Sequence, residues 1–229
     1  MTKKKLKNQF TIKIYLHKLF DSFVLFAYYR IFLIKYVCKN IIFFSLIEKK
    51  DTILDSKPAR WGTKAYRDAK QLYMKAFPEW ERFSMFSLLA MSLHRNVKFH
   101  AIYDDGKFCG ITYYAENDNT VYLTYLAVSE KLRGQGYGSK ILTMLEDNFP
   151  DKQIVIDIEP VTKKVKNYKQ RVSRLKFYER NGFHRTDQKL KDPDGEFEAL
   201  TTGERLDKNS FIKILRQMSF GFYQARVEK

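Results

Sequence analysis

Three glycines stand at alternate positions, Gly134, Gly136 and Gly138, directly after Arg133 in the segment RGQGYG. The apolar run 122–128 before them has the composition of a buried strand. Apolar residues at helical spacing follow the glycines, and a proline ends that pattern. The sequence therefore predicts a strand that passes directly into a helix through a stretch of backbone with few side chains.

A junction of this kind suits a phosphate group. The first N–H groups of a helix lack partners inside the helix and carry partial positive charge, and glycine lets the main chain approach a ligand closely. Arg133 adds a cation, and Ser139 adds a hydroxyl donor. The spacing is neither the G-x-G-x-x-G dinucleotide fingerprint nor that of a nucleotide-binding P-loop. A structural turn is the alternative, and we favour the phosphate site because a turn does not need three glycines.

The chain from Thr63 onward predicts a mixed α/β (α+β) fold. Helical patterns cover 63–76, 84–93, the stretch from the glycines to Pro150, 171–182 and a last helix with Phe211, Ile214, Leu215 and Met218 on one face. Strand patterns cover two runs on either side of Asp104-Asp105-Gly106, then 121–128, 153–160, a strand near Phe183 and 196–200. This order predicts a mixed sheet with helices on both faces and a parallel strand–helix–strand unit over 121–159.

Two segments resemble the GNAT superfamily of N-acetyltransferases. The run LAVSEKLRGQGYGSKIL is similar to the acyl-CoA-binding motif of that family, with Arg133, Gly136 and Gly138 at its fixed positions. The run FYERNGF, residues 177–183, is similar to the Tyr–Glu–x–x–Gly–Phe segment that the family carries after the following helix. Because the two motifs occur in register, the resemblance extends over about 61–200.

The resemblance implies a central sheet that splays between 121–128 and 153–160, and acetyl-CoA as the cosubstrate. The pantetheine arm would follow the strand edge at Leu126, Ala127 and Val128, much as an added strand would. The pyrophosphate would bind the main-chain amides of the following residues: Arg133, Gly134, Gln135, Gly136, Tyr137, Gly138 and Ser139.

Attack of an amine on a thioester requires two proton movements. An ammonium with a pKa of about 10 must lose a proton before it attacks, and the departing thiolate needs a proton donor. Tyr178 matches the tyrosine that serves as acid in the family, with helix packing as its alternative role. We expect Glu159 as the base and Glu81 as the second candidate, although each could be a solvated surface carboxylate. Arg171 and Arg174 either contact the CoA 3′-phosphate or lie on a solvated helix face, which is the interpretation we favour.

The expected function is therefore transfer of an acetyl group from acetyl-CoA to a primary amine of a small molecule or a peptide. A non-catalytic CoA-binding or regulatory module of the same fold is the alternative. The fold does not select the acceptor. Three aromatic residues in the first two helical segments, Trp80, Phe83 and Phe86, belong either to the acceptor site or to the core.

Residues 1–55 have no counterpart in the resemblance, and we expect the acyltransferase domain in 56–229. Residues 1–50 carry eleven Lys/Arg against two acidic residues, so most of the net charge of +16 lies there. Charges interrupt every apolar run in this segment before it reaches the 18 to 20 residues of a membrane span. The segment is either a membrane-surface anchor or a translated region upstream of the true start, and 48–62 is the expected link into the domain.

Composition limits the remaining alternatives. The basic charge comes without a nucleic-acid-binding motif, so we expect no nucleic-acid partner. Two cysteines, Cys38 and Cys109, lack metal-site spacing and suit a reducing cytoplasm, and the four histidines form no ligand pattern, so we expect no metal. The oligomeric state stays open, a dimer included.

Overall fold

A computed structural model describes residues 54–163, 165–192, 195–218 and 226–228 of the protein. The expectations for residues 1–50, including the membrane-surface anchor, lie outside these residues. The elements in chain order are β1 (Asp55–Pro58), α2 (Lys64–Ala76), the 3-10 helix η1 (Glu79–Glu81), α3 (Met85–Met91), β2 (Val97–Asp104), β3 (Lys107–Glu116), β4 (Thr120–Val128), the 3-10 helix η2 (Glu130–Leu132), α4 (Tyr137–Asn148), β5 (Gln153–Ile158), α5 (Tyr168–Arg180), β6 (His184–Asp192), β7 (Gly195–Thr201), α6 (Lys208–Met218) and β8 (Arg226–Glu228).

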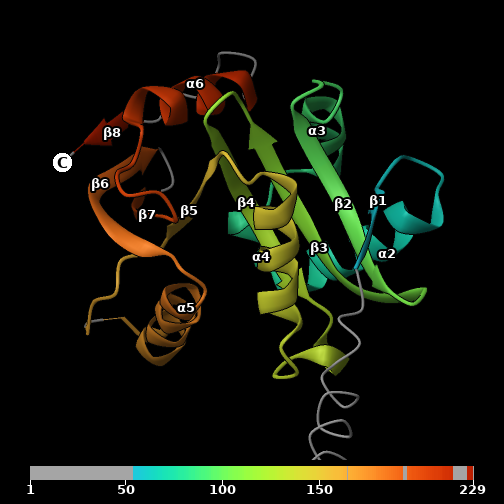
Figure 1. The fold of residues 1–229 in the computed structure, drawn as a ribbon. Helices are drawn as coiled ribbons and strands as arrows, with labels where there is room; N and C mark the ends of the chain where they lie inside the picture. The colour runs from blue at the N-terminus through green and yellow to red at the C-terminus, as the bar shows by residue number, and fades with distance from the viewer. Residues whose placement is uncertain (1–53, 164, 193–194, 219–225, 229) are drawn as a thin grey trace, which may run out of the picture. The chain divides into compact units, whose positions relative to one another are not determined.

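The strands form one eight-stranded sheet in the order β1-β2-β3-β4-β5-β7-β6-β8. Strands β4 and β5 run parallel, and the other neighbouring strands run antiparallel. Helices α4 and α5 pack on one face of the sheet, and α2, α3 and α6 pack on the other (Figure 1). The predicted mixed sheet with helices on both faces is confirmed, as is the parallel β4–α4–β5 unit.

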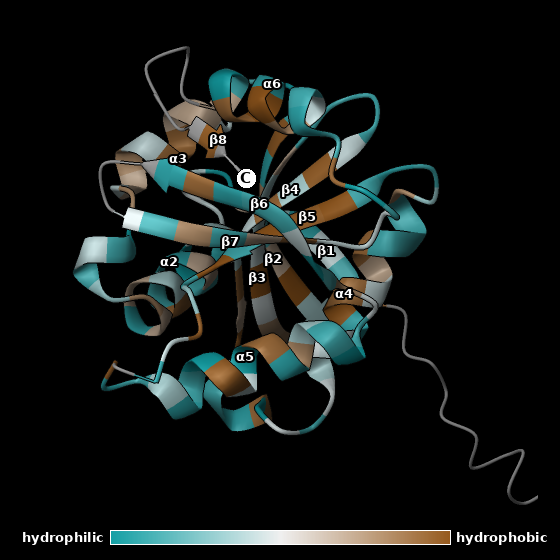
Figure 2. Cartoon of the chain, turned by 90° about the vertical axis from the view of Figure 1, so that its left-hand side faces the viewer, coloured by the Kyte–Doolittle hydropathy of each residue, from teal (hydrophilic) through white to brown (hydrophobic). Residues whose placement is uncertain are grey.

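Each face of the sheet has its own hydrophobic core. Tyr73, Leu88 and Phe211 are fully buried under α2, α3 and α6, and Leu142 and Leu200 are fully buried under α4 and α5. Figure 2 shows the hydrophobic strands between helices whose outward surfaces are mostly hydrophilic. Burial of each large apolar side chain contributes roughly 1.5–3 kcal/mol, so the two cores hold the rigid scaffold on which a site can be built.

The β2–β3 hairpin turns where the sequence predicts it. Asp105 and Gly106 occupy the two central positions with φ angles of 48° and 76°. Positive φ at both positions matches the right-handed twist of paired strands, and Asp-Gly tolerates it better than most residue pairs. Asp104 then pairs with Lys107, which fixes the register of the long β2 and β3 strands.

The prediction that 48–62 is only a link was wrong, because β1 lies within it. Residues 55–58 pair through their backbone with the outer edge of β2, from Asp55 opposite Tyr103 to Pro58 opposite His100. Three of their four side chains are exposed, so the strand leaves no alternation of apolar and polar residues in the sequence. β8 is a second edge strand that we did not predict, and it pairs with β6 over three residues.

Helix α5 begins three residues earlier than the predicted 171–182 and ends at Arg180, two residues before the predicted glycine. Gly182 has φ of 83°, its N–H bonds to the carbonyl of Glu179, and the N–H of Phe183 bonds to that of Tyr178. These two bonds form the Schellman motif, in which a residue in the left-handed conformation lets the N–H groups after the helix bond to its last carbonyl groups. The segment 177–183, which resembles the GNAT motif, is therefore the C-terminus of a helix, and its backbone conformation requires the positive φ of Gly182.

Strands β4 and β5 pair only at their starts. Their register runs over Thr120, Val121 and Tyr122 opposite residues 153–155, whereas β4 continues to Val128 and β5 to Ile158. Two residues after the last pair, the register of β4 with β3 shifts so that Thr124 is the extra residue of a bulge. A bulge bends its strand and increases the local twist. The strands therefore separate beyond Tyr122, and the predicted splay is confirmed.

Candidate active site

The splay leaves one edge of β4 without a strand partner. Leu126, Ala127 and Val128 pair on one side with Thr112, Ile111 and Gly110 of β3. On the side of β5, the described strands make no ladder pair with these three residues. The Val128 carbonyl accepts from Arg133 Nε at 3.4 Å. The other outward-facing backbone groups of such an edge are available to an extended ligand, as in the addition of a peptide strand. The edge lies where the sequence predicts the pantetheine arm.

Main-chain amides at the start of α4 are also available. Gly134 and Gly136 have φ angles of 74° and 83°, and Gly136 is the last residue before the helix. Among the described residues, no acceptor forms a hydrogen bond with five N–H groups in this segment, which belong to Gly134, Gly136, Tyr137, Gly138 and Ser139. The other two predicted amides are already bonded, Arg133 to the carbonyl of Glu130 and Gln135 to that of Leu132. The segment from 133 to 136 is exposed.

Two side-chain contacts help to hold this segment in place, and neither could be predicted from the sequence. The Tyr137 hydroxyl donates to a carboxylate oxygen of Asp104 at 2.7 Å, and this bond raises the pKa of Tyr137 to about 12. The Phe177 ring of α5 lies so close to Gly138 that a Cβ there would be 2.9 Å from its Cζ atom. The third glycine of the motif therefore serves the packing of α5 against α4, while the first two serve the turn.

Tyr178 lies on α5, in the core between α5 and the sheet. Its ring packs edge-on against Phe177 and Phe183, with centroids 5.1 and 5.5 Å away. Within the described part of the chain, its hydroxyl has no hydrogen-bond partner. Burial raises the pKa of Tyr178 to about 12. The phenol is therefore fully protonated at neutral pH and can act as a proton donor.

Glu159 follows β5 and lies in an ion-pair cluster with both predicted arginines. Its carboxylate is 2.6 Å from Arg171 Nη2 and 3.4 Å from Arg174 Nη1, and its side chain is only 11% exposed. Arg171 also donates to the carbonyl of Pro160 and to Asn167 Oδ1, each at 2.9 Å. A solvated helix face was thus the wrong prediction for Arg171, whose side chain is 16% exposed. From the sequence, Arg171 is simply a hydrophilic residue on a helix, so its ion pair with Glu159 across the β5–α5 loop could not be predicted.

Glu81 ends η1, on the opposite side of the splay from α5. Burial raises the pKa of its carboxyl above the usual value, and the charges of Arg174, Glu159 and Asp157 also act on it. Unlike Glu159, it forms no ion pair with any residue that the structure describes. Tyr125 of β4 fixes the loop, because its hydroxyl donates to the Glu81 carbonyl at 2.7 Å. Glu81 is therefore held over β4 with an unpaired carboxylate.

The aromatic side chains around Glu81 face solvent. Trp80, Phe83 and Phe86 are 63%, 39% and 82% exposed. Phe83 also contacts the ring of Tyr125, with centroids 6.2 Å apart. The alternative that these three residues form part of the core is wrong.

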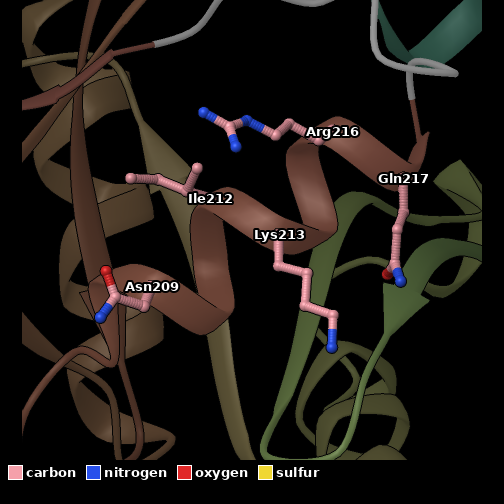
Figure 3. A pocket seen from close by; sticks show the side chains of 5 residues that line it. All are labelled: Asn209, Ile212, Lys213, Arg216 and Gln217. Atoms are coloured by element: carbon pink, nitrogen blue, oxygen red, sulfur yellow. The ribbon is translucent and has the colours of Figure 1, made fainter.

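A separate hollow of about 540 Å³ lies on α6 and has different chemistry. Figure 3 shows its lining, which consists of Asn209, Ile212, Lys213, Arg216 and Gln217. All five belong to the outer side of one helix, and none is a predicted site residue. The residues that the sequence predicts for the site therefore lie at the β4–β5 splay and at the start of α4, and not in this hollow.

Two features are absent from the described residues. In that part of the chain, no helix is long and apolar enough to span a membrane. The same residues contain no group of three or more His, Cys, Asp or Glu side chains that could hold a metal ion. Cys109 is a buried free thiol, and Cys38 lies outside the described residues.

Comparison with known proteins gives concordant results. A family model for the acetyltransferase (GNAT) domain matches residues 95–185, which contain the splay, the glycine segment and Tyr178. A Bacillus subtilis (strain 168) protein named "Putative acetyltransferase YjbC" is 34% identical over 107 residues, which are 47% of this chain and 52% of that protein. The match thus spans about half the length of this curated relative.

Among solved structures, a "Putative acetyltransferase from GNAT family" of Bacteroides thetaiotaomicron has the same fold, with a TM-score of 0.58. The similarity covers 73% of this chain and 98% of that one at 21% sequence identity. The splayed sheet and this structural similarity agree with the family-model match, and residues 95–185 carry an acetyltransferase (GNAT) domain.

Proposed function

We propose that the protein is an acetyl-CoA-dependent N-acetyltransferase that acts by direct attack of a primary amine on the thioester. The observation that carries this proposal is a pair of backbone surfaces close together in the chain. The β4 edge at 126–128 lacks a described strand partner on the side of β5, and the five amides at the start of α4 have no described acceptor. One surface suits an extended amide-bearing arm, and the other suits a diphosphate. Acetyl-CoA carries both groups in one molecule.

In this proposal the main-chain amides of Gly134, Gly136, Tyr137, Gly138 and Ser139 bind the diphosphate oxygens. Arg133 is exposed beside them and adds a positive charge. The N–H groups of Arg133 and Gln135 are bonded within the loop, so their role is to hold the shape of the turn. The pantetheine arm then follows Leu126, Ala127 and Val128 into the splay.

The unpaired Glu81 and Tyr178 carry the proton transfers. Glu81 accepts a proton from the bound ammonium, which frees the nitrogen lone pair to attack the acetyl carbon. The C–N bond forms, the C–S bond breaks, and the electron pair of that bond leaves on sulfur. Tyr178 donates its proton to this sulfur and recovers one from the newly formed amide nitrogen. Glu159 is bonded to Arg171 and Arg174, so its role here is to position α5 relative to β5.

Calorimetric titration with acetyl-CoA, combined with thiol detection on a panel of primary amines, tests this function. We expect saturable binding and release of CoA thiol that depends on the amine. Absence of binding at millimolar acetyl-CoA would contradict the proposal. Binding without thiol release for any amine would favour the non-catalytic CoA-binding module.

A further inference from the structure

The acceptor side of the splay has an unusual surface. Within the seven residues from Trp80 to Phe86, three aromatic side chains are exposed to solvent. Soluble proteins seldom leave large apolar side chains clustered on the surface, and such clusters mark binding sites for apolar groups. Trp80 and Phe83 flank Glu81, the proposed base, in sequence.

Hydrogen bonds fix this segment over the splay. Tyr125 donates its hydroxyl to the carbonyl of Glu81 at 2.7 Å and accepts from the N–H of Phe83 at 3.4 Å. The hydroxyl of Tyr73 donates to the carbonyl of Phe83 at 3.2 Å. Because Tyr125 directly follows the bulge in β4, the aromatic side chains are anchored beside the strand that would present the thioester.

The charges around the splay disfavour an acceptor with several cations. Glu81 has no ion-pair partner among the described residues, while Glu159 is neutralised by two arginines. The other charges that act on Glu81 are the cations Arg174 and Arg171 and the carboxylates Glu159 and Asp157, so these four charges offset one another. One ammonium therefore meets one net negative charge among these groups, and the further cations of a polyamine or an aminoglycoside would have no second net negative charge to bind there.

We infer that the acceptor is a molecule with one reacting amine next to a large apolar group, and that Trp80, Phe83 and Phe86 bind this group. The inference rests on the proposed function and adds the substrate class to it. Glu81 takes the proton of the single ammonium, and the aromatic side chains remove the neighbouring apolar surface from water. Trp80, at 63% exposure, offers the largest ring for this contact.

Matched amines test the substrate class. Phenylalaninamide and glycinamide present the same amine and differ only in the benzyl group, and spermidine presents several cations. We expect kcat/KM for phenylalaninamide to exceed that for glycinamide by about tenfold or more, the usual discrimination from one apolar group. Spermidine should be the poorest of the three.

The chain offers a matched control in its other tryptophan. Trp61 is 75% exposed but precedes α2, a helix of 13 residues and about 20 Å in length, whereas the Trp80 segment follows the other end of that helix. We expect Trp80→Ala to bring the phenylalaninamide-to-glycinamide ratio close to one, and Phe86→Ala to lower it as well. Trp61→Ala should leave the ratio at the wild-type value.

Three results would overturn the inference alone while the enzyme proposal stands: spermidine as the best acceptor, equal rates with phenylalaninamide and glycinamide, or the same ratio in Trp80→Ala and Trp61→Ala. Bound acetyl-CoA with no turnover of any amine would overturn the proposed function and this inference together. Absence of acetyl-CoA binding would remove the basis of both at the first step.

Discussion

Helices α2 and α4 both follow a glycine with nearly the same backbone angle, yet their N-termini are completed in different ways. Before α2, Gly62 has φ of 81° and Thr63 caps the helix, since its side-chain oxygen accepts from the N–H of Tyr66 at 3.1 Å. Before α4, Gly136 has φ of 83° and brings no side chain, so the first amides stay unpaired among the described residues. At the start of α2 the protein itself supplies an acceptor for the N–H of Tyr66, whereas we expect a ligand to supply the acceptors at the start of α4.

The same contrast separates the titratable groups of the site. Glu159 is bonded to two arginines and Glu81 is not. The Tyr125 hydroxyl holds the Glu81 loop, whereas no described residue bonds the Tyr178 hydroxyl. We therefore propose that the paired groups are structural and that Glu81 and Tyr178, which lack such partners among the described residues, take part in the reaction.

The largest expected effect comes from replacing the glycine that begins α4. A valine at φ of 83° is strained, and relief of that strain turns the neighbouring amides away. Loss of two charge-assisted hydrogen bonds to phosphate, each worth about 1.5–3 kcal/mol, should raise the Kd of acetyl-CoA by about 1,000-fold in Gly136→Val. Calorimetric titration measures this change.

Gly62→Val is the control for backbone strain. The two glycines have φ angles within a few degrees of each other, and in the described part of the chain a Cβ at either position meets no atom within 4 Å. Both variants should lose similar stability in thermal unfolding, and Gly62→Val should retain its affinity for acetyl-CoA. Equal affinities in the two variants would show that the α4 amides do not bind the cosubstrate.

The next largest effect should come from the unpaired carboxylate. Glu81→Gln removes the proposed base, and we expect kcat/KM to fall by about 100-fold, the lower end for general base catalysis. Glu159→Gln should chiefly lower thermal stability, because it leaves Arg171 without its carboxylate partner. A larger loss of rate in Glu159→Gln than in Glu81→Gln would reverse the assignment.

Tyr178→Phe should lower kcat by about tenfold and change the Kd of acetyl-CoA little. The effect is smaller than that of a lost base because a thiolate, with a pKa of about 8.5, is a good leaving group and water can protonate it. Tyr114 provides the matched control, since burial also raises its pKa to about 12 and it lies in the same core. Tyr114→Phe with the same loss of kcat would remove Tyr178 from the mechanism.

The pH profile provides a further check on this residue. A group with its pKa raised to about 12 keeps its proton up to that pH, so the donor form of Tyr178 is lost only at the alkaline extreme. The kcat of the wild-type enzyme should therefore not decline between pH 7 and pH 10. A decline centred near pH 8 or 9 would point to a donor other than Tyr178.

The smallest expected effect concerns the capped helix. Thr63→Ala removes the side-chain acceptor for the N–H of Tyr66 and should lower the free energy of unfolding by about 1 kcal/mol. Chemical denaturation measures it. The affinity for acetyl-CoA should be unchanged, and a weakened affinity would mean that the two helix starts are coupled.

Local patterns were the predictable part of the fold and of the site. The Asp-Gly turn, the glycines before α4 and the glycine after α5 each depend on a backbone angle that few residues adopt, so the sequence reveals them directly. β1 was missed because an edge strand held only by backbone bonds needs no particular side chains. Its four residues therefore resemble a linker.

The pairing state of a side chain could not be predicted in the same way. Glu159 and Glu81 are the same residue type, so the sequence does not distinguish them. The path of the β5–α5 loop brings Arg171 to Glu159. The exposure of Trp80 and Phe86 also depends on tertiary packing, because an aromatic residue suits a core and a binding site equally well. Contacts between segments distant in the sequence determine which carboxylate is paired and which aromatic residue is exposed. Such contacts could not be predicted from this one sequence.

Amide NMR during titration with CoA tests the central claim most directly. Binding of the diphosphate should shift the amide protons of Gly134, Gly136, Tyr137, Gly138 and Ser139 strongly downfield, while those at the start of α2 stay in place. Pantetheine, which lacks the diphosphate, should leave the five signals unmoved. Saturation of the protein with CoA without movement of these five amides would contradict the account.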